Sequence, residues 1–331
     1  MHITPASAIL LYICNNFRPM NLNRLIGLVI ICLLLPLNTM AVSGTEPNLP
    51  NKDSIDDYHP PTDVNQYEGY KLVWQDEFDK DGRPAAHWTY EHGFVRNREL
   101  QWYQPDNAIV KDGMLVIEGR KEVVPNPQYE MGSDDWRRNR KQAEYTSACL
   151  TTRESFRFKY GRVEVRAMIP TASGSWPAIW LLGNQWGWPS CGEIDMMEYY
   201  ISNGLPSILA NACWDSGRRG APAWDSVVAP LTHFTQRDTD WAKKFHIWRM
   251  DWDELFIRLY LDDELLNTID LSQTLNKGGR GRGENPFSNE IEGFGMYLLL
   301  NLAIGENGGT PDDGQFPLRY LIDYVRVYAQ Q

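Results

Sequence analysis

The sequence has few cysteines, no excess of positive charge and no internal repeat. Five of its 331 residues are cysteine, and 32 basic side chains stand against 43 acidic ones, which gives a formal net charge of −11. A protein with this charge balance does not attract nucleic acid or an anionic membrane surface through its overall field. We therefore expect neither nucleic acid nor, for the mature form, a membrane as a partner.

The sequence also lacks an apolar run of membrane-spanning length. The run from Leu25 to Leu37 covers 13 residues, whereas a span needs about 20. Arg24 precedes this run and the small residues of segment 39–44 follow it, which is the pattern of a secretory signal peptide. We expect residues 1–43 to be that peptide, with Met20 as a candidate true start and an uncleaved anchor as the alternative.

Cleavage after the signal peptide would leave an exported acidic chain. The loss of Arg18 and Arg24 lowers the formal net charge from −11 to −13. Residues 44–66 are polar and rich in proline, so we expect a linker there and a catalytic domain over residues 67–331. The expected location is secreted or periplasmic, and we expect a monomer.

Three cysteines would remain in the mature chain, namely Cys149, Cys191 and Cys213. An odd number without metal-ligand spacing gives no disulfide framework. Buried free thiols are therefore favoured, and a Cys191–Cys213 pair across neighbouring strands is the alternative.

From about residue 71 onward the chain consists of short β-type runs separated by turn signals such as Asp112-Gly113. The clearest runs are 71–74, 108–110, 114–120, 160–169, 208–214, 256–261, 296–304 and 322–328. Many short strands within roughly 265 residues indicate one all-β sandwich. No amphipathic helix of ordinary length stands out, although residues 239–246 suggest one or two helical turns. Segments 125–141 and 215–239 are interpreted as long loops.

Three acids stand within six residues of an otherwise apolar segment. Side chains alternate along a strand, so Glu193 and Asp195 share one face. Glu198 has the wrong parity, and one extra residue at Met196-Met197, a β-bulge, would return it to that face. Burying three like charges is costly unless they share protons or perform chemistry. Two carboxylates facing one cleft are what cleavage of a glycosidic bond requires. The alternative is a solvated acidic strand or a cation site.

Further motifs accompany the acids along the whole domain. They are Trp74–Phe78, Asn97–Tyr103, Tyr145–Ala148, Tyr160–Ala167, Trp176–Trp180, Leu300–Gly305 and Asp323–Tyr328. Together with Glu193–Glu198 they make the chain resemble glycoside hydrolase family 16, in the laminarinase-like branch with a bulged Glu-x-Asp-x-x-Glu signature. The resemblance covers about residues 71–329, with the motifs in family order.

The resemblance implies a fold and a reaction. The fold is a concanavalin A-like β-jelly-roll of two curved antiparallel sheets with a concave cleft, and the reaction is hydrolysis of internal β-linkages with retention. By resemblance, Glu193 is the nucleophile, Glu198 the general acid/base, and Asp195 a helper that shares a proton with the nucleophile. A retaining enzyme needs two carboxyl groups about 5–5.5 Å apart, one ionised and one protonated. Close negative charges separate the pKa values of such a pair.

Sugar rings stack on aromatic side chains, so aromatic residues are expected along the cleft. By family position, the expected substrate-binding residues are Asn97, Glu99, Trp102, Tyr103, Trp176 and Trp180, with Trp214 as a plausible addition. Trp224 is a further candidate. For any single tryptophan, packing in the core is the alternative.

The resemblance requires no cofactor for catalysis but implies a structural calcium ion on the convex side in many relatives. The matching ligands are Glu77, the Gly113 carbonyl and Asp323, and the alternative is a surface salt bridge. Oxygen ligands of this kind suit calcium. His246 matches a core-strand position, where we expect a structural histidine with satisfied hydrogen bonds.

Two positions depart from the family pattern. Cys213 stands where relatives usually have a histidine, and Cys149 where they often have an arginine. A basic cluster adds a further feature; its members are Arg137, Arg138, Arg140, Lys141, Arg218, Arg219, Arg280 and Arg282. It could meet sulfated or acidic sugars, but a solvated loop balanced by Asp134 and Asp135 is favoured.

The sequence thus predicts a secreted endo-acting hydrolase of a polysaccharide, with a β-1,3-glucan or mixed-linkage β-glucan as the best substrate. A β-galactan, either agar-like, carrageenan-like or a host glycan, is the alternative within the family. A non-catalytic jelly-roll carbohydrate-binding protein is the second alternative. The sequence does not decide between hydrolysis and transglycosylation.

Overall fold

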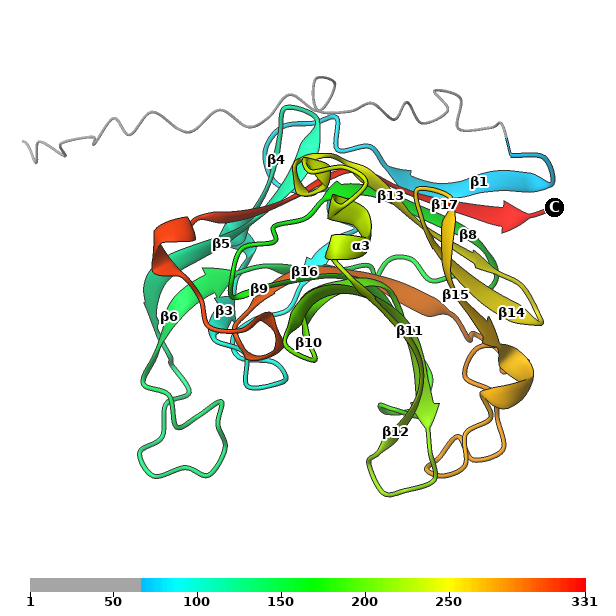
Figure 1. Ribbon diagram of the computed structural model, residues 1–331. Coiled ribbons are helices and arrows are strands. Elements are labelled where there is room, and N and C mark those ends of the chain that lie inside the picture. The colour runs from blue at the N-terminus through cyan, green and yellow to red at the C-terminus, as the bar shows by residue number, and fades with distance from the viewer. Residues whose placement is uncertain (1–66) are drawn as a thin grey trace, which may run out of the picture. The chain divides into compact units, whose positions relative to one another are not determined.

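Two curved β-sheets packed face to face form the part of the chain that the computed structural model describes, residues 67–331 (Figure 1). The all-β sandwich predicted from the strand pattern is confirmed. The expected signal peptide and linker, residues 1–66, lie outside the described residues. No helix in the described part is both long and apolar enough to cross a membrane.

One sheet has ten strands and forms the convex side of the sandwich. Its order is β15-β14-β13-β8-β17-β5-β6-β3, with β1 paired to β17 and β4 to β5. All of its pairs are antiparallel except β3 with β6. The strands are β1 (Tyr70–Asp76), β3 (Gln101–Tyr103), β4 (Ala108–Lys111), β5 (Met114–Pro125), β6 (Gln142–Ser147), β8 (Gly161–Met168), β13 (His246–Trp252), β14 (Phe256–Leu261), β15 (Glu264–Asp270) and β17 (Leu318–Gln330).

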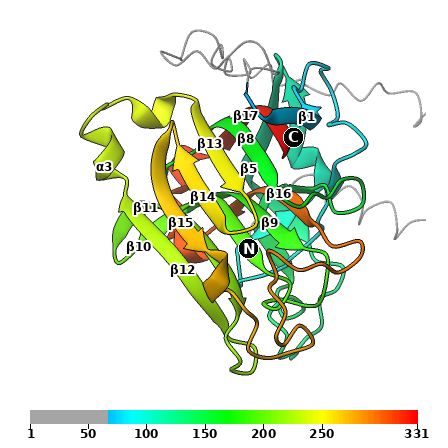
Figure 2. The same ribbon diagram turned by 90° about the vertical axis from the view of Figure 1, so that its right-hand side faces the viewer.

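The other sheet has seven antiparallel strands in the order β12-β11-β10-β9-β16-β7-β2. Its strands are β2 (Thr89–Tyr90), β7 (Cys149–Thr151), β9 (Ser175–Gly183), β10 (Glu193–Ser202), β11 (Leu205–Asp215), β12 (Pro222–Pro230) and β16 (Met296–Ile304). Figure 2 shows β12 at the outer edge of this sheet, next to β11. The strongly curved strands β9, β10 and β11 carry the site described below.

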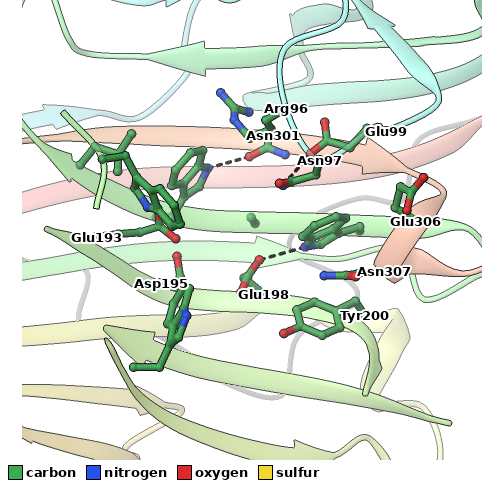
Figure 3. Close-up of a pocket in the computed structure, with 16 residues that line it drawn as sticks. Arg96, Asn97, Glu99, Glu193, Asp195, Glu198, Tyr200, Asn301, Glu306 and Asn307 are labelled. Carbon is green, nitrogen blue, oxygen red and sulfur yellow. Dashed lines mark hydrogen bonds between the residues drawn. The ribbon is translucent and has the colours of Figure 1, made fainter. Parts of the chain in front are cut away.

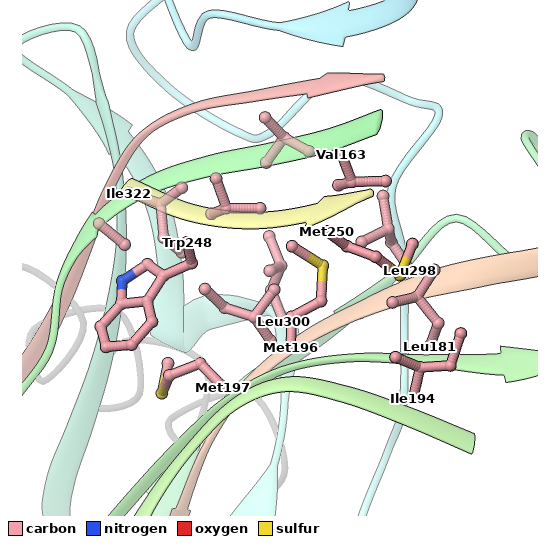
Figure 4. Close-up of a cluster of buried hydrophobic side chains, with 14 of the residues drawn as sticks. Val163, Leu181, Ile194, Met196, Met197, Trp248, Met250, Leu298, Leu300 and Ile322 are labelled. Carbon is pink, nitrogen blue, oxygen red and sulfur yellow. The ribbon is translucent and has the colours of Figure 1, made fainter. Parts of the chain in front are cut away.

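The main hydrophobic core lies between the two sheets (Figure 4). As the alternation in β8 predicts, Val163, Val165 and Ala167 point inward and are fully buried. They meet Ile194 and Met196 of the opposite sheet within the same cluster. This packing fixes β10 from below, so that its other face is held in a defined position.

Several predicted strands match closely and one segment was missed. Runs 256–261 and 296–304 coincide with β14 and β16, and the others lie within or next to observed strands. Segment 215–239, interpreted as a loop, instead contains the nine-residue strand β12 and the short helix α3 (Thr232–Thr235). β12 is an edge strand that begins and ends with proline, which hides it from a search for regular strands. The expected helical turns at 239–246 reduce to one short 3₁₀ helix, Trp241–Lys243.

Buried single residues outside the core also follow their predictions. Cys149, Cys191 and Cys213 are buried free thiols, so the Cys191–Cys213 pair does not form in this structure. His246 is buried, with Nδ1 2.5 Å from the Asp262 carboxylate and Nε2 2.8 Å from the Trp241 carbonyl. That is the satisfied structural histidine expected at this position.

The residues predicted to bind calcium are engaged in ion pairs. Glu77 accepts two hydrogen bonds from Arg326, at 2.8 and 2.9 Å, and Asp323 pairs with Arg166. Within residues 67–331 no group of three or more His, Cys, Asp or Glu side chains is arranged to hold a metal ion. The calcium site at Glu77, the Gly113 carbonyl and Asp323 stays a prediction, and an ion bound there would compete with Arg326 and Arg166 for the two carboxylates.

Candidate active site

A β-bulge in β10 brings the three acids of the sequence signature onto one face. Asp195 pairs with Asn211 and Glu198 with Leu209, so three residues of β10 span two residues of β11. The register shifts at the same place against β9. The extra residue rotates Glu198 back to the side of Glu193 and Asp195, as predicted, while both intervening methionines stay fully buried.

The three acids line a cavity of about 640 Å³ on the concave side of the seven-stranded sheet. Figure 3 shows Glu193, Asp195 and Glu198 pointing into it. The remaining lining residues are Arg96, Asn97, Glu99, Trp176, Ala178, Trp180, Leu182, Trp188, Tyr200, Trp224, Asn301, Glu306 and Asn307. Aromatic rings and polar groups therefore converge on the carboxyl row.

Each outer acid of the row accepts a hydrogen bond from an indole. Trp188 Nε1 donates to Glu193 at 2.9 Å, and Trp176 Nε1 donates to Glu198 at 2.9 Å (Figure 3 draws the latter). The Asn211 amide lies 3.5 Å from Asp195 Oδ2 and 3.4 Å from Glu198 Oε2. These neutral N–H groups fix the carboxyl orientations without supplying a countercharge.

Burial raises the pKa values of the whole row, and repulsion from neighbouring acids adds to this effect at Asp195 and Glu198. Burial raises the pKa of Glu193 to about 7, against the opposing effect of the Trp188 hydrogen bond. Burial, and then the charge of Glu193, raises the pKa of Glu198 to about 7. The pKa of Asp195 lies well above its usual range, because it is buried between the other two. Near neutral pH the row therefore holds protons and carboxylates together, as acid–base chemistry on one substrate requires.

Arg96 is a basic group at the edge of this row. Its guanidinium lies 4.9 Å from the centre of the Trp180 ring and forms an ion pair with Glu91. Its charge also acts to lower the pKa of Glu193, although burial outweighs it. Arg96 and Glu91 both lie beside the Cys149 thiol, where relatives often have an arginine. A guanidinium from another segment is thus present beside the residue that departs from the family pattern.

Four of the predicted substrate-binding residues line the cavity: Asn97, Glu99, Trp176 and Trp180. Glu99 is buried and accepts hydrogen bonds from Asn97 Nδ2 at 3.2 Å and from Gln101 Nε2 at 2.6 Å. Trp180 donates to Asn301 at 2.7 Å, and Arg96 lies over its ring, so little of that ring is free to stack on a sugar. The further candidate Trp224 is 45% exposed and also lines the cavity.

Three predicted binding residues do not line this cavity in the described structure: Trp102, Tyr103 and Trp214. Trp102 packs edge-on against Phe94, and Tyr103 is fully buried with its hydroxyl accepting from Asn301 Nδ2 at 3.0 Å. Trp214 belongs to the core between the sheets. Its parity on β11 explains this, since Cys213 pairs with Glu193 and the next side chain must point to the opposite face.

Several lining residues had no prediction. Trp188 follows a turn before β10, while Glu306 and Asn307 follow the end of β16, so long-range folding alone brings them together. Asn301 and Asn211 lie within predicted strands. Asn211 lies two residues from Cys213 on β11 and pairs with Asp195. The alternation of side chains along the strand therefore predicts that Asn211 faces the same side as the acids.

Comparison with known proteins agrees with this geometry. Residues 98–281 match the family described as glycosyl hydrolases family 16. A glucan endo-1,3-beta-glucosidase A1 from Niallia circulans is 31% identical, over 86% of this chain and 42% of its own length. A beta-glucanase from Rhodothermus marinus is 33% identical, over 78% of this chain and 85% of its own length. The chain thus spans less than half of the first relative and most of the second.

A solved structure extends the comparison to another substrate. It comes from work on endo-acting O-glycanases, which prominent members of the human gut microbiota express to initiate mucin breakdown. It aligns with a TM-score of 0.69 and 37% sequence identity, over 82% of this chain and 94% of that one.

Proposed function

Since this chain belongs to glycosyl hydrolase family 16, and is therefore a glycoside hydrolase, we propose that it cuts internal β-linkages of a polysaccharide by a retaining double displacement. The observation that carries the proposal is the carboxyl row of β10, in which Glu193 and Glu198 face one cavity and each accepts a hydrogen bond from an indole. The bulge between them brings both carboxyl groups onto one face of the strand.

In the first step, a Glu193 oxygen attacks the anomeric carbon of the sugar bound at the row. The bond to the leaving oxygen breaks as Glu198 gives that oxygen its proton, which leaves a glycosyl ester on Glu193. In the second step, Glu198 takes a proton from water, the resulting hydroxide attacks the anomeric carbon, and Glu193 leaves as a carboxylate. Two inversions at one carbon retain the configuration.

Asp195 supports the nucleophile in this scheme. Burial and the two neighbouring acids raise its pKa well above the usual range, which favours the protonated form, and its hydroxyl can then donate to the Glu193 carboxylate. That hydrogen bond lowers the pKa of Glu193, which opposes the effect of burial. Asp195 therefore keeps the nucleophile ionised without adding a third negative charge.

The proposed substrate is a β-1,3-glucan, or the β-1,3 bonds of a mixed-linkage glucan. The names of the two curated relatives support this choice. A β-galactan or host O-glycan is the second candidate, because the identity to the O-glycanase structure, 37%, exceeds that to either glucanase. Cys213, which pairs with Glu193 where relatives usually carry a histidine, also favours keeping that candidate.

A product screen tests the proposal. Residues 44–331 are incubated with laminarin, mixed-linkage glucan, agarose, carrageenan and mucin glycans, with Glu193→Gln as the inactive control. Oligosaccharides from the glucans support the first candidate, and products from a galactan or mucin alone support the second. Binding without products from any polymer would contradict hydrolysis and favour a carbohydrate-binding protein.

Export of the protein is part of the same proposal. A polysaccharide is too large to enter a cell intact, so an endo-acting enzyme meets it outside. The signal-like pattern of residues 1–43 provides the route, and N-terminal sequencing of the protein recovered from culture medium would test cleavage near Ser43.

A further inference from the structure

Two glycine-rich loops touch each other at one end of the concave face. They are segments 215–221 and 276–284, and we call them the arginine loops. The Lys277 amide donates to the Asp215 carbonyl at 3.0 Å, and the Asp215 amide donates to Asn276 Oδ1 at 2.9 Å. A side chain on Gly278 would lie 2.9 Å from the Gly217 Cα, so glycine permits this contact.

The arginine loops concentrate positive charge on an acidic protein. Their basic side chains, all exposed, are Arg218, Arg219, Lys277, Arg280 and Arg282, against the two acids Asp215 and Glu284. Asp215 is buried and accepts from Ser190 Oγ at 2.8 Å and from the Gly217 amide at 2.6 Å. Within the described chain, none of the five basic groups has an acidic partner within 4 Å.

The arginines of the opposite rim differ, because the loop between β5 and β6 uses them internally. Arg137 pairs with Asp135 at 3.5 Å, and Arg138 with Glu130 at 2.6 Å. Arg140 donates to the carbonyls of Glu99 and Arg98, at 2.5 and 2.7 Å. Figure 1 shows this loop and the arginine loops at opposite ends of the concave side. The predicted basic cluster is therefore two groups. In the loop between β5 and β6 the three arginines are engaged by acids or by backbone carbonyls, whereas in the described chain the basic side chains of the arginine loops have no acidic partner within 4 Å.

The arginine loops border a second basin that adjoins the cleft. This basin, of about 680 Å³, is lined by Trp186, Gly187, Trp188, Pro189, Ser190, Asp215, Gly220, Gly279 and Arg280. Trp188 also lines the cleft and donates its indole N–H to Glu193. Trp188 is half exposed and lines both cavities. Its ring therefore lies between Glu193 and the basin that holds Arg280. A glycan bound at Glu193 can extend past this ring into the basin.

We propose that the arginine loops form a subsite for anionic substituents, sulfate esters or carboxylates, on sugar units that lie beyond Trp188. The inference rests on the proposed function, because it takes the glycan in the cleft as given. Guanidinium groups bind sulfate and carboxylate oxygens through paired hydrogen bonds. A chain with net charge −11 otherwise repels an anionic polysaccharide, and five local positive charges counter this repulsion where the polymer enters. A neutral glycan requires no such cluster.

Binding to matched polymers tests the subsite apart from turnover. The Glu193→Gln protein is titrated calorimetrically with laminarin and partially sulfated laminarin of the same length, and with desulfated and native keratan sulfate. The readout is the ratio of Kd for the neutral form to Kd for the sulfated form. We expect a preference for the sulfated form in at least one pair. In the background of Glu193→Gln, Arg280→Gln with Arg282→Gln should lower that ratio about tenfold.

The matched control removes two exposed basic groups elsewhere, Lys71→Gln with Arg83→Gln, and should leave the ratio as it was. An equal fall in the control would mean that overall charge sets the preference, and would overturn the subsite. No preference in either pair, or a ratio that survives the arginine changes, would also overturn it. Hydrolysis assays on the neutral polymers report separately on the proposed function, so the two failures are distinguishable.

Discussion

The two outer surfaces of this sandwich bury charge in different ways. On the convex face of the ten-stranded sheet, three buried or half-buried acids pair with arginines: Arg162 with Asp251 at 2.6 Å, Arg166 with Asp323, and Arg326 with Glu77 at 2.8 Å. A fourth acid of this face, the buried Glu164, accepts a hydrogen bond from the Tyr67 hydroxyl at 2.7 Å. On the concave face, Glu193, Asp195 and Glu198 accept hydrogen bonds from indole and amide N–H groups and have no ion-pair partner in the described chain.

The difference shows what each surface can do. An acid neutralised by an arginine gains stability but holds no proton that it could donate. An acid neutralised by a proton keeps that proton available, and its pKa moves toward neutrality. The arginine-paired acids of the convex face are therefore suited to holding the sheet together, and the carboxyl row of the concave face to proton transfer.

The strongest test of this comparison between the two faces replaces the nucleophile Glu193 by a neutral side chain. Glu193→Gln should lower kcat by about 10⁴-fold or more, because the first bond to the sugar cannot form. The folded protein should be at least as stable as before, since one acid of a repelling row is gone. Steady-state kinetics and thermal unfolding measure the two effects, with exposed Glu68→Gln as the control. A kcat within tenfold of the parent would remove Glu193 from the mechanism.

Removal of the acid/base should be the next largest effect. Glu198→Ala should lower kcat on a polysaccharide by about 10³-fold, because the leaving oxygen no longer receives a proton. The loss should be much smaller for an aryl glycoside whose leaving group needs no protonation. Assays on both substrate types measure this split, and an equal loss on both would argue against the role of Glu198.

On the convex face, breaking a pair should affect stability and spare catalysis. Arg166→Met leaves the buried Asp323 carboxylate without its arginine and should lower the free energy of unfolding by about 3 kcal/mol or more. Urea denaturation measures this, and kcat on laminarin or on another cleaved polymer should stay near the parent value. Arg83→Met, which removes an exposed partner 3.8 Å from Asp106, should cost less than about 1 kcal/mol. Equal losses in the two variants would contradict the distinction between buried and exposed pairs.

The stability of the fold should also depend on pH. Glu193 and Glu198 have pKa values raised to about 7 in the folded protein, against ordinary values near 4.5 when unfolded. Between these limits the folded state binds more protons than the unfolded state, so its stability falls as the pH rises from about 4.5 to about 7. The fall should be about 1.4 kcal/mol per pH unit for each of the two groups.

Unfolding in urea at several pH values measures this slope. In Glu193→Gln with Glu198→Gln the slope over that range should flatten, because these side chains no longer titrate. A slope that persists unchanged in the double variant would mean that other groups are responsible for it.

Much of this arrangement could be predicted because it depends on local alternation. The faces of Gly161–Met168 and the bulge between Asp195 and Glu198 follow from the side-chain period of a strand. The expectation that Trp214 lines the cleft is wrong, because the alternation of side chains along β11 directs it into the core. Arg96 and Trp188 reach the site from loops. The local sequence pattern of a loop does not predict which part of the folded protein its side chains contact. Strand β12 was missed because proline at both of its ends resembles a turn.

The bulge in β10 has a consequence for how this strand can change during evolution. Deleting Met196 would leave two residues of β10 opposite two of β11, with Asp195 still facing Asn211 and Glu198 still facing Leu209. The ladder would become regular, all three acids would keep their face, and Glu198 would keep its partner on β11. One codon thus separates a bulged and a regular version of this strand, which carry the same three acids on the same face. A lineage carrying this sandwich could exchange one version for the other without rebuilding its core.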